Sequence, residues 1–464
     1  MGQKTSTIQN KVKAIQDNKA RVTDVSFDQV DITEKVARKI ADGLRENNNV
    51  QRLSLKNCNL STLSVRHLSD ALCNIAITSN IQRLDLANNS TIGVEAGKYL
   101  ANVLLNNKVL EHLILNNCGL EDDGTVSVAT SLCKNCTLIT LEIGTNGITD
   151  LGAKLLGEML KTNTRLEGLS LWQNELSAEG AQFLAQGLQI NKTLLWLGLG
   201  SNQIEAQGVW ALTESLRSGS PLLWLGLGGN SIGDRGVLHL ASLLQEDCSS
   251  LQSLGLGGNE IQDEGIKILA TSLKTNTRLR SLGLGGNQIA DEGGQAIGDM
   301  LTANHTLKKL LLSSNLLGDS AVVYISDGLR YNSGLELLLL ADNPFGDDGG
   351  LSLTQVLCKE NVSLKVLDIH GTRMSHHTEQ KVVHQLQQLS KLTKLGSAYG
   401  AKESSQQRST SVSHHTESTS LSQRSTSFIS QRDEGEARKM AREKQREKFL
   451  SQALAQKTST AQLF

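Results

Sequence analysis

Apolar residues recur along most of the chain in one frame, with leucine or a similar residue at positions 1, 4, 6 and 11 and asparagine at position 9. The frame is most regular between Leu194 and Asn287, where the runs WLGLGSN, WLGLGGN, SLGLGGN and SLGLGGN follow one another. Successive units start 28 to 31 residues apart, mostly 28 or 29, and such a period is typical of a repeat solenoid. Position 1 falls at Val22, Val50, Ile81, Leu110, Leu138, Leu166, Leu194, Leu222, Leu251, Leu279, Leu307, Leu335 and Leu364.

Each unit divides into a short strand and a helix. In the unit that begins at Leu251, Leu254 and Leu256 alternate with other residues, which predicts a strand with one buried face. The acidic side chain of Asp263 suits the positive end of a helix, so a helix is expected to begin there. The helix carries apolar residues at the spacing of a buried stripe, namely Ile266, Leu269, Ala270 and Leu273. One strand and one helix per unit predict a parallel sheet on the concave side and helices on the convex side.

The frame resembles the ribonuclease-inhibitor class of leucine-rich repeat proteins, through Leu251, Leu254, Leu256, Asn259 and Ile261 and the helical half that follows. The resemblance covers residues 22–395 and implies an α/β leucine-rich repeat solenoid, or horseshoe, of about 13 repeats of 28–29 residues. The repeats are similar to those of NOD-like receptors and of the Ran GTPase-activating protein. The same scaffold serves many unrelated functions, so the resemblance bears on fold more than on activity. The position-9 asparagines are assigned to turn hydrogen bonds.

Residues 1–21 precede the first repeat as an N-terminal arm or cap. Their opening, Met1-Gly2-Gln3-Lys4-Thr5-Ser6, fits the pattern for N-myristoylation of Gly2. One acyl chain binds a membrane only weakly and needs a second signal, which nearby basic residues such as Lys4 and Lys11 would supply. The alternative is a helical cap on the first repeat, made by Ile8, Val12 and Ile15. The two interpretations are compatible.

Residues 396–464 form a Ser/Thr/Gln-rich tail, whose composition predicts disorder, with a charged segment at 434–450 that has the spacing of a solvated helix. The motif QRSTS occurs twice, and its arginine suits a basophilic kinase acting on Ser411 and Ser427. Low-complexity drift is the alternative explanation. Before the tail, the sequence predicts an amphipathic helix that caps the last repeat, through Val382, Val383, Leu386 and Leu389.

Composition narrows the classes of function. A formal net charge of -1 gives the chain no nucleic-acid signature. An apolar run long enough to span a membrane and the apolar core of a signal peptide are both missing, so a cytoplasmic location is expected, with membrane association through Gly2. Seven cysteines without a paired spacing agree with a reducing compartment, and Cys133 and Cys136 are read as repeat variation rather than as metal ligands. The sequence shows no catalytic constellation, so neither enzyme activity nor a cofactor is expected.

The candidate binding surface is the concave face, made of positions 3, 5 and 7 of each repeat. In the central repeats these positions carry tryptophan, serine and glycine, and a glycine within a strand costs roughly 0.5 to 1 kcal/mol. We expect this strip to let a partner approach the backbone closely, with partly exposed tryptophans as anchors. Repeat duplication, with Trp172 lying over Gly200, is the alternative. The predicted partner-binding residues are Trp172, Trp196, Trp224, Gly198, Gly200, Gly226, Gly228, Gly255, Gly257, Gly283 and Gly285.

The sequence therefore predicts a non-enzymatic scaffold that binds a protein partner on its concave face. Regulation of a small GTPase is one alternative, which the resemblance to the Ran GTPase-activating protein implies, although the acidic C-terminal region of that family is missing from this sequence. A structural part of a cytoskeletal or ciliary assembly is another. The identity of the partner and the oligomeric state are left open.

Overall fold

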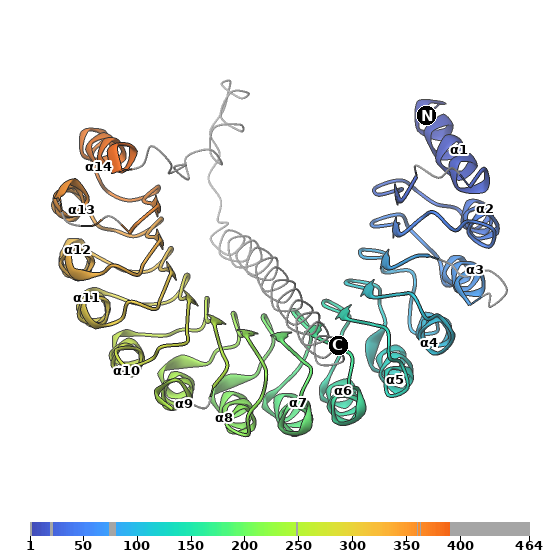
Figure 1. The fold of residues 1–464 in the computed structure, drawn as a ribbon, viewed down its shortest axis with the longest axis horizontal. Helices are drawn as coiled ribbons and strands as arrows, with labels where there is room; N and C mark the ends of the chain where they lie inside the picture. The colour runs from blue at the N-terminus through green and yellow to red at the C-terminus, as the bar shows by residue number, and fades with distance from the viewer. Residues whose placement is uncertain are drawn as a thin grey trace, which may run out of the picture. The chain divides into compact units, whose positions relative to one another are not determined.

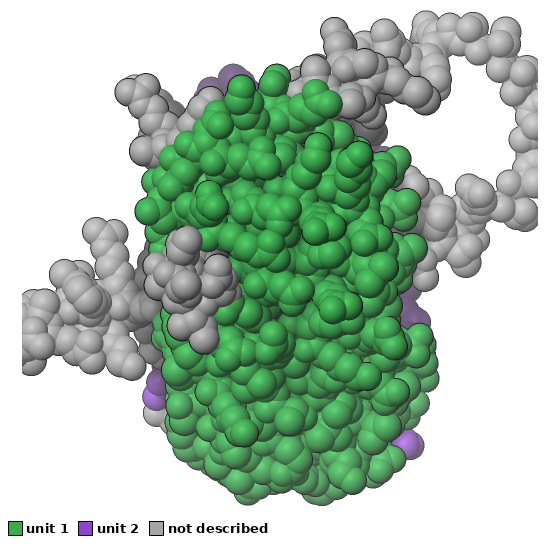
Figure 2. All heavy atoms as spheres, turned by 90° about the vertical axis from the view of Figure 1, so that its right-hand side faces the viewer, with its two compact units in different colours: residues 1–222 green, residues 223–464 purple. Residues whose placement is uncertain are grey.

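The computed structural model describes residues 2–18, 22–73, 80–246, 249–359, 361 and 363–389. The chain divides into two compact units, Met1–Leu222 and Leu223–Phe464, which Figure 2 colours green and purple. Within each unit a short strand alternates with a helix along the chain, and the strands line one side while the helices line the other (Figure 1).

Unit 1 contains parallel strands that pair in chain order, each with the next. Its strands are β1 (Asp24–Ser26), β2 (Arg52–Ser54), β3 (Arg83–Asp85), β4 (His112–Ile114), β5 (Thr140–Glu142), β6 (Gly168–Ser170) and β7 (Trp196–Gly198). Its helices are α1 (Gly2–Gln16), α2 (Glu34–Leu44), α3 (Thr62–Leu72), α4 (Ala96–Asn106), α5 (Glu121–Leu132), α6 (Asp150–Thr162), α7 (Ala178–Ile190) and α8 (Glu205–Leu216).

Unit 2 has the same arrangement, with each strand parallel to the next. Its strands are β8 (Trp224–Gly226), β9 (Ser253–Gly255), β10 (Ser281–Gly283), β11 (Lys309–Leu311), β12 (Leu337–Leu339) and β13 (Val366–Asp368). Its helices are α9 (Gly233–Gln245), α10 (Asp263–Leu273), α11 (Asp291–Ala303), α12 (Asp319–Tyr331), α13 (Asp347–Lys359) and α14 (His376–Leu389).

The described residues thus form thirteen parallel strands and fourteen helices, and the predicted leucine-rich repeat solenoid of about 13 repeats is confirmed. The pairing register keeps each repeat position beside the same position of the next repeat. In unit 2, Leu254 pairs with Leu282, and Leu282 pairs with Leu310. The register is the same even where a repeat is longer, as between Arg52 and Arg83, because the additional residues lie outside the strands.

The hydrophobic core lies between strands and helices, where the sequence pattern predicts it. In the repeat that begins at Leu251, the strand leucines Leu254 and Leu256 are at most 1% exposed. The helix α10 buries its predicted stripe of Ile266, Leu269, Ala270 and Leu273. Neighbouring repeats share this core, so each repeat depends on the next for burial of its apolar residues.

The position-9 asparagines hydrogen-bond from one repeat to the next, as the sequence predicts. Asn259 is fully buried, and its Nδ2 donates to the carbonyl oxygens of Leu227 and Leu256, each at 3.0 Å. Its Oδ1 accepts from the Asn230 amide at 2.7 Å. The side chain therefore satisfies turn groups in two successive repeats, which the backbone alone would leave unpaired.

Two further ladders were missed in the sequence. An asparagine three residues before position 1 bonds the end of the preceding helix, as Asn276 Nδ2 does with the Leu244 carbonyl at 2.7 Å, and its Oδ1 accepts from the Leu279 amide at 2.8 Å. The first-turn aspartate of one helix accepts from the residue that opens the next, as Asp263 Oδ1 does from the Ala290 amide at 2.7 Å. These acidic residues therefore join repeats, in addition to lying at the positive end of their own helix.

Helix α1 packs against the first repeat through Val12 and Ile15, which are buried, and Ile8, which is half-buried. Asn47 Nδ2 donates to the Ile15 carbonyl at 2.8 Å. Lys11 Nζ donates to the Ser26 carbonyl, so one of the basic residues expected to contact lipid is engaged within unit 1. At the other end, α14 buries Val382 and Leu386.

Candidate functional site

Two of the three predicted tryptophan anchors are buried rather than partly exposed. Trp196 in β7 is 1% exposed and Trp224 in β8 is 3% exposed, so the expected exposure of these two side chains is wrong. Only Trp172 of the three is half-buried. The physical reason lies in the adjacent glycines, because a strand position without a Cβ leaves a flat backbone surface on which an indole ring packs.

Each indole covers a particular glycine. A Cβ built on Gly168, which pairs with Trp196 across β6 and β7, would overlap the Trp196 ring. A Cβ on Gly144 would overlap the Trp172 ring in the same way, so Trp172 covers Gly144. In unit 2, a Cβ on Gly226 would overlap the ring of Trp224, two residues earlier. The tryptophans therefore shield backbone in the way that large side chains compensate for glycine in strands.

The glycines of β8 to β10, with those that follow each strand, form a glycine strip in unit 2. We define it as Gly226, Gly228, Gly255, Gly257, Gly283 and Gly285. The strip lies on the face of the sheet opposite the buried leucines, because successive strand residues point to opposite faces. In unit 1, the predicted site residues Gly198 and Gly200 end β7 and follow it.

Steric demands differ along the glycine strip. A Cβ on Gly228 would lie 3.0 Å from the Gly257 carbonyl oxygen, and one on Gly257 would lie 2.9 Å from the Gly285 carbonyl oxygen. Close strand packing therefore excludes a side chain at Gly257 and disfavours one at Gly228. Gly255 differs, because the nearest heavy atoms to its Cβ direction are the Gly226 Cα at 3.7 Å and the Leu225 carbonyl oxygen at 4.0 Å. Its φ is not in the left-handed region, so neither packing nor backbone conformation requires glycine there.

A second group of side chains lies on the same face of unit 2, on β12 and β13. Leu337 pairs with Val366, and Leu339 pairs with Asp368. Leu337, Leu339 and Val366 are half-buried, whereas the equivalent positions of β9 and β10 carry serine or glycine. The sequence placed Leu337 and Leu339 on the concave face but gave them no role, although their contrast with the glycine repeats was a readable signal.

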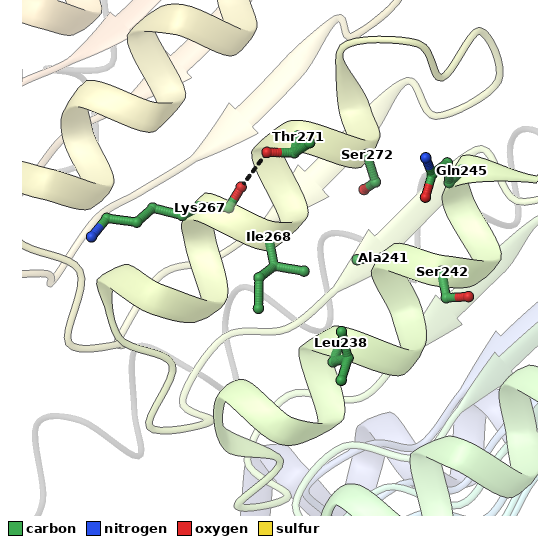
Figure 3. Close-up of a pocket in the computed structure, with 8 residues that line it drawn as sticks. All are labelled: Leu238, Ala241, Ser242, Gln245, Lys267, Ile268, Thr271 and Ser272. Carbon is green, nitrogen blue, oxygen red and sulfur yellow. Dashed lines mark hydrogen bonds between the residues drawn. The ribbon is translucent and has the colours of Figure 1, made fainter.

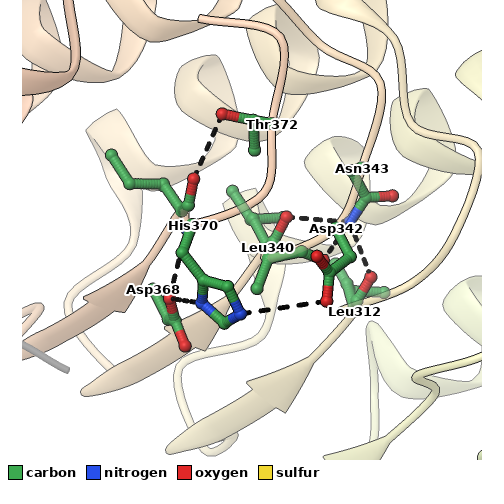
Figure 4. Close-up of polar contacts among 9 residues, drawn as sticks. Leu312, Leu340, Asp342, Asn343, Asp368, His370 and Thr372 are labelled. Atoms are coloured by element: carbon green, nitrogen blue, oxygen red, sulfur yellow. Dashed lines mark hydrogen bonds and ion pairs between the residues drawn. The ribbon is translucent and has the colours of Figure 1, made fainter. Parts of the chain in front are cut away.

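His370 sits between two carboxylates at the carboxyl ends of these strands (Figure 4). Its Nδ1 lies 2.6 Å from Asp368 Oδ1, and its Nε2 lies 3.8 Å from Asp342 Oδ2. Burial by itself lowers the pKa of the His370 imidazole, but the hydrogen bond to Asp368 and the charges of Asp368 and Asp342 outweigh burial and raise it. The Asp342 amide donates to the His370 carbonyl at 2.8 Å, which fixes the two turns relative to each other.

A groove of about 500 Å³ lies on the helical side of unit 2, between α9 and α10 (Figure 3). Its apolar lining comes from Leu238 and Ile268, which are both exposed. At its rim, Lys267 Nζ contacts Glu264 at 2.7 Å and Glu292 at 2.5 Å. Among the described residues that line the groove, Lys267 is the one charged group, and it already pairs with these two carboxylates.

The predicted modification sites are not tested by these contacts. Gly2 opens helix α1, and its acylation stays a prediction. Ser411 and Ser427 lie outside the described residues. In the described part of the chain, no group of three His, Cys, Asp or Glu side chains is arranged to hold a metal ion. A search of the same residues finds no helix with the length and apolar character needed to cross a membrane.

Comparisons with known proteins agree with the repeat architecture. The sequence model described as "Leucine Rich repeat" matches residues 106–129, 134–157, 247–270 and 275–298. A comparison with curated protein sequences finds no match.

Among solved structures, an internalin from Listeria monocytogenes is similar at 20% identity and a TM-score of 0.45, over 84% of this chain and 92% of that one. The yeast Rad7 and Elc1 complex is similar at 18% identity and a TM-score of 0.40, over 74% of this chain and 90% of that one. The mouse RP105/MD-1 complex is similar at 20% identity and a TM-score of 0.44, over 79% of this chain and 57% of that one. At such identities the likeness concerns the fold alone. The repeated frame, the parallel strands and helices that it forms, and the family matches identify the chain as a leucine-rich repeat protein.

Proposed function

We propose that this protein is a non-enzymatic interaction scaffold and that a protein partner docks on the strand face of unit 2, over the glycine strip. The leucine-rich repeat fold supports protein binding as the general function. Gly255 is the observation that supports this surface in particular. Its missing side chain does nothing for the packing of the strands, and it leaves the β9 backbone open to a partner.

The energetics favour a role for this glycine outside the fold. Glycine in a strand costs roughly 0.5 to 1 kcal/mol relative to alanine, because it loses more conformational freedom on folding. At Gly228 and Gly257 the close approach of the next carbonyl oxygen explains why glycine is present despite that cost. At Gly255 no packing contact explains the presence of glycine, so we attribute it to contact with a partner.

The test is a Gly255→Arg variant, with Thr271→Arg as the matched control. Thr271 belongs to the same repeat but is exposed on α10, on the helical side, so both variants add the same side chain to opposite faces. Proximity labelling in cells identifies the partner, and its affinity for the purified full-length chains is then measured. We expect Gly255→Arg to weaken binding at least about tenfold, which corresponds to roughly 1.4 kcal/mol. Thr271→Arg should bind as the unchanged protein does.

Thermal unfolding of both variants separates loss of binding from loss of fold. We expect melting temperatures close to that of the parent, because the Gly255 Cβ has room. Unchanged affinity of Gly255→Arg would refute docking over the glycine strip. Replacing Trp196 and Trp224 by alanine is a poorer test, because both side chains are buried and their removal would destabilise the protein.

A further inference from the structure

The strand face of unit 2 ends in a group of residues whose chemistry differs from that of the glycine strip. We call it the β12–β13 patch and define it as Leu337, Leu339, Val366, Asp342, Asp368 and His370. Strand pairing brings the three aliphatic side chains together, since Leu337 lies beside Val366 and Leu339 lies beside Asp368. The patch therefore joins an aliphatic surface to two carboxylates at the carboxyl ends of the strands.

The two carboxylates remain accessible despite their contacts with His370. The Asp342 side chain is 55% exposed and the Asp368 side chain is 23% exposed. Within the described residues, His370 is the one basic side chain recorded in contact with either carboxylate, and it touches Asp368 through Oδ1 alone. The second carboxylate oxygen of Asp368 can therefore accept from a donor that reaches the patch.

Basic residues elsewhere on these strands do not neutralise the carboxylates. Lys365 precedes β13 and pairs with Glu336 at 2.7 Å, where the strands begin. Lys309 opens β11, again at the amino ends of the strands. The Lys365–Glu336 pair and Lys309 thus lie at the amino ends of the strands, away from Asp342 and Asp368 at the carboxyl ends.

We propose that the β12–β13 patch binds a segment of another protein that carries a lysine or arginine next to aliphatic side chains. The cation contacts Asp342 and Asp368, and the aliphatic residues pack on Leu337, Leu339 and Val366. Charge-assisted hydrogen bonds to a carboxylate are stronger than neutral ones, and an apolar contact beside them excludes water. This inference rests on the proposed docking function and names the chemistry of the partner.

His370 makes the binding depend on pH. Asp368 on β13 and Asp342 in the turn after β12 are the charged groups that face its ring. A protonated imidazole already supplies a positive charge to both carboxylates and so competes with the cation of the partner. Binding is therefore strongest with neutral His370 and weakens as pH falls through the pKa of His370.

The experiment pans a displayed library of random 12-residue peptides on the full-length chain and on an Asp342→Asn, Asp368→Asn double variant. We expect the parent to enrich peptides with Lys or Arg beside Leu, Ile or Val, and the double variant to lose them. The affinity of one enriched peptide is then measured by fluorescence anisotropy. It should fall at least about tenfold in the double variant and remain unchanged in Asp348→Asn, which removes an exposed carboxylate from α13.

Further arms test the apolar contact and the histidine. Val366→Ser should weaken binding of the peptide at least about fivefold. The parent should bind it at least about fivefold more weakly at pH 5.5 than at pH 8, and His370→Asn should remove that difference while it preserves binding at pH 8. Enrichment of acidic peptides, no enrichment, or equal binding to the double variant would overturn the proposal.

Two results separate this proposal from neighbouring ones. A synthetic peptide of residues 438–450, the basic run of this chain, serves as a competitor. If that peptide binds the patch more tightly than the enriched peptides do, the occupant is the chain itself and the assignment to another protein is wrong. If Gly255→Arg loses its partner while panning shows no basic preference, the chemistry of the patch is wrong and the docking function stands.

Discussion

The position-9 asparagine ladder makes a stability prediction that the structure quantifies. Asn259 is fully buried, and Asn259→Ala removes its Nδ2 bonds to the carbonyl oxygens of Leu227 and Leu256. The change also removes the acceptor of the Asn230 amide. A buried polar group that loses its partner costs about 1 to 3 kcal/mol. The Leu227 and Leu256 carbonyls keep a second donor, Nδ2 of Asn230 and of Asn287 respectively, so each of these lost bonds costs only about 0.5 to 1.5 kcal/mol. Together with the cost at the Asn230 amide, the free energy of unfolding should fall by about 2 to 6 kcal/mol.

Two of the natural exceptions to the ladder sharpen the prediction. Cys58 and Cys118 occupy position 9, and their Sγ atoms donate to the Phe27 and Leu86 carbonyl oxygens, each at 3.2 Å. Those carbonyls hold the same place in the repeat as the Leu227 carbonyl. A thiol thus keeps the donor role of the amide, whereas its sulfur is only a weak acceptor for the position-9 backbone amide of the preceding repeat, as at Val30 and Asn89. Asn259→Cys should therefore cost about half as much as Asn259→Ala, or about 1 to 3 kcal/mol.

The assay is urea unfolding monitored by far-ultraviolet circular dichroism. Free energies of unfolding are compared between variants whose free energy depends on urea concentration with the same slope. Gln288→Ala is the control, because this side chain is exposed one position beyond the ladder in the next repeat. Surface substitutions of that kind change stability by about 0.5 kcal/mol or less. If Asn259→Ala and Gln288→Ala unfold at the same urea concentration, the buried ladder does not carry the stability assigned to it.

The remaining predictions concern the buried indole and the thiols. Trp224→Ala should lower the free energy of unfolding by about 3 to 5 kcal/mol, because it removes a side chain that is 3% exposed and uncovers Gly226, whereas Trp210→Ala on the exposed side of α8 should cost much less. Equal losses in thermal unfolding would contradict this. Burial raises the pKa of the Cys58 thiol to about 11 and that of Cys118 to about 12, so at pH 8 iodoacetamide should modify Cys133, Cys136 and Cys358 before these two, as peptide mass spectrometry would show. Because a raised thiol pKa favours the folded state only while the thiol keeps its proton, stability should also decline as pH rises from the ordinary thiol pKa toward these values.

The position of each repeat was readable from the sequence because each position of the repeated frame carries the same kind of residue and has the same structural role in every repeat. Leu254 and Leu256 had to be buried, and Asn259 had to satisfy a turn, in every repeat of this period. The ladder through Asp263 was harder to read. Its sequence signal, an acidic residue in the first turn, has a sufficient explanation in the helix dipole, and only the contact with Ala290 shows the bond to the next repeat.

The candidate site depended on contacts that spacing does not encode. The sequence placed Trp196 on the concave face but left its ring free to point outward or to lie flat, and the structure shows it lying over Gly168. It gave Gly228, Gly255 and Gly257 the same appearance, although a carbonyl oxygen crowds two of them and leaves the third open. His370, Asp342 and Asp368 come from two repeats, so their cluster exists only where the turns meet.

The number of repeats, the register of the strands, the buried leucines and the asparagine ladder can be read from the sequence, because all of them follow from the repeated frame. The packing of neighbouring repeats decides which glycines are sterically crowded, which tryptophans are buried, and which carboxylates gather around His370. Those properties depend on the distance between atoms of neighbouring repeats, and a distance across the sheet is fixed by packing rather than by spacing along the chain.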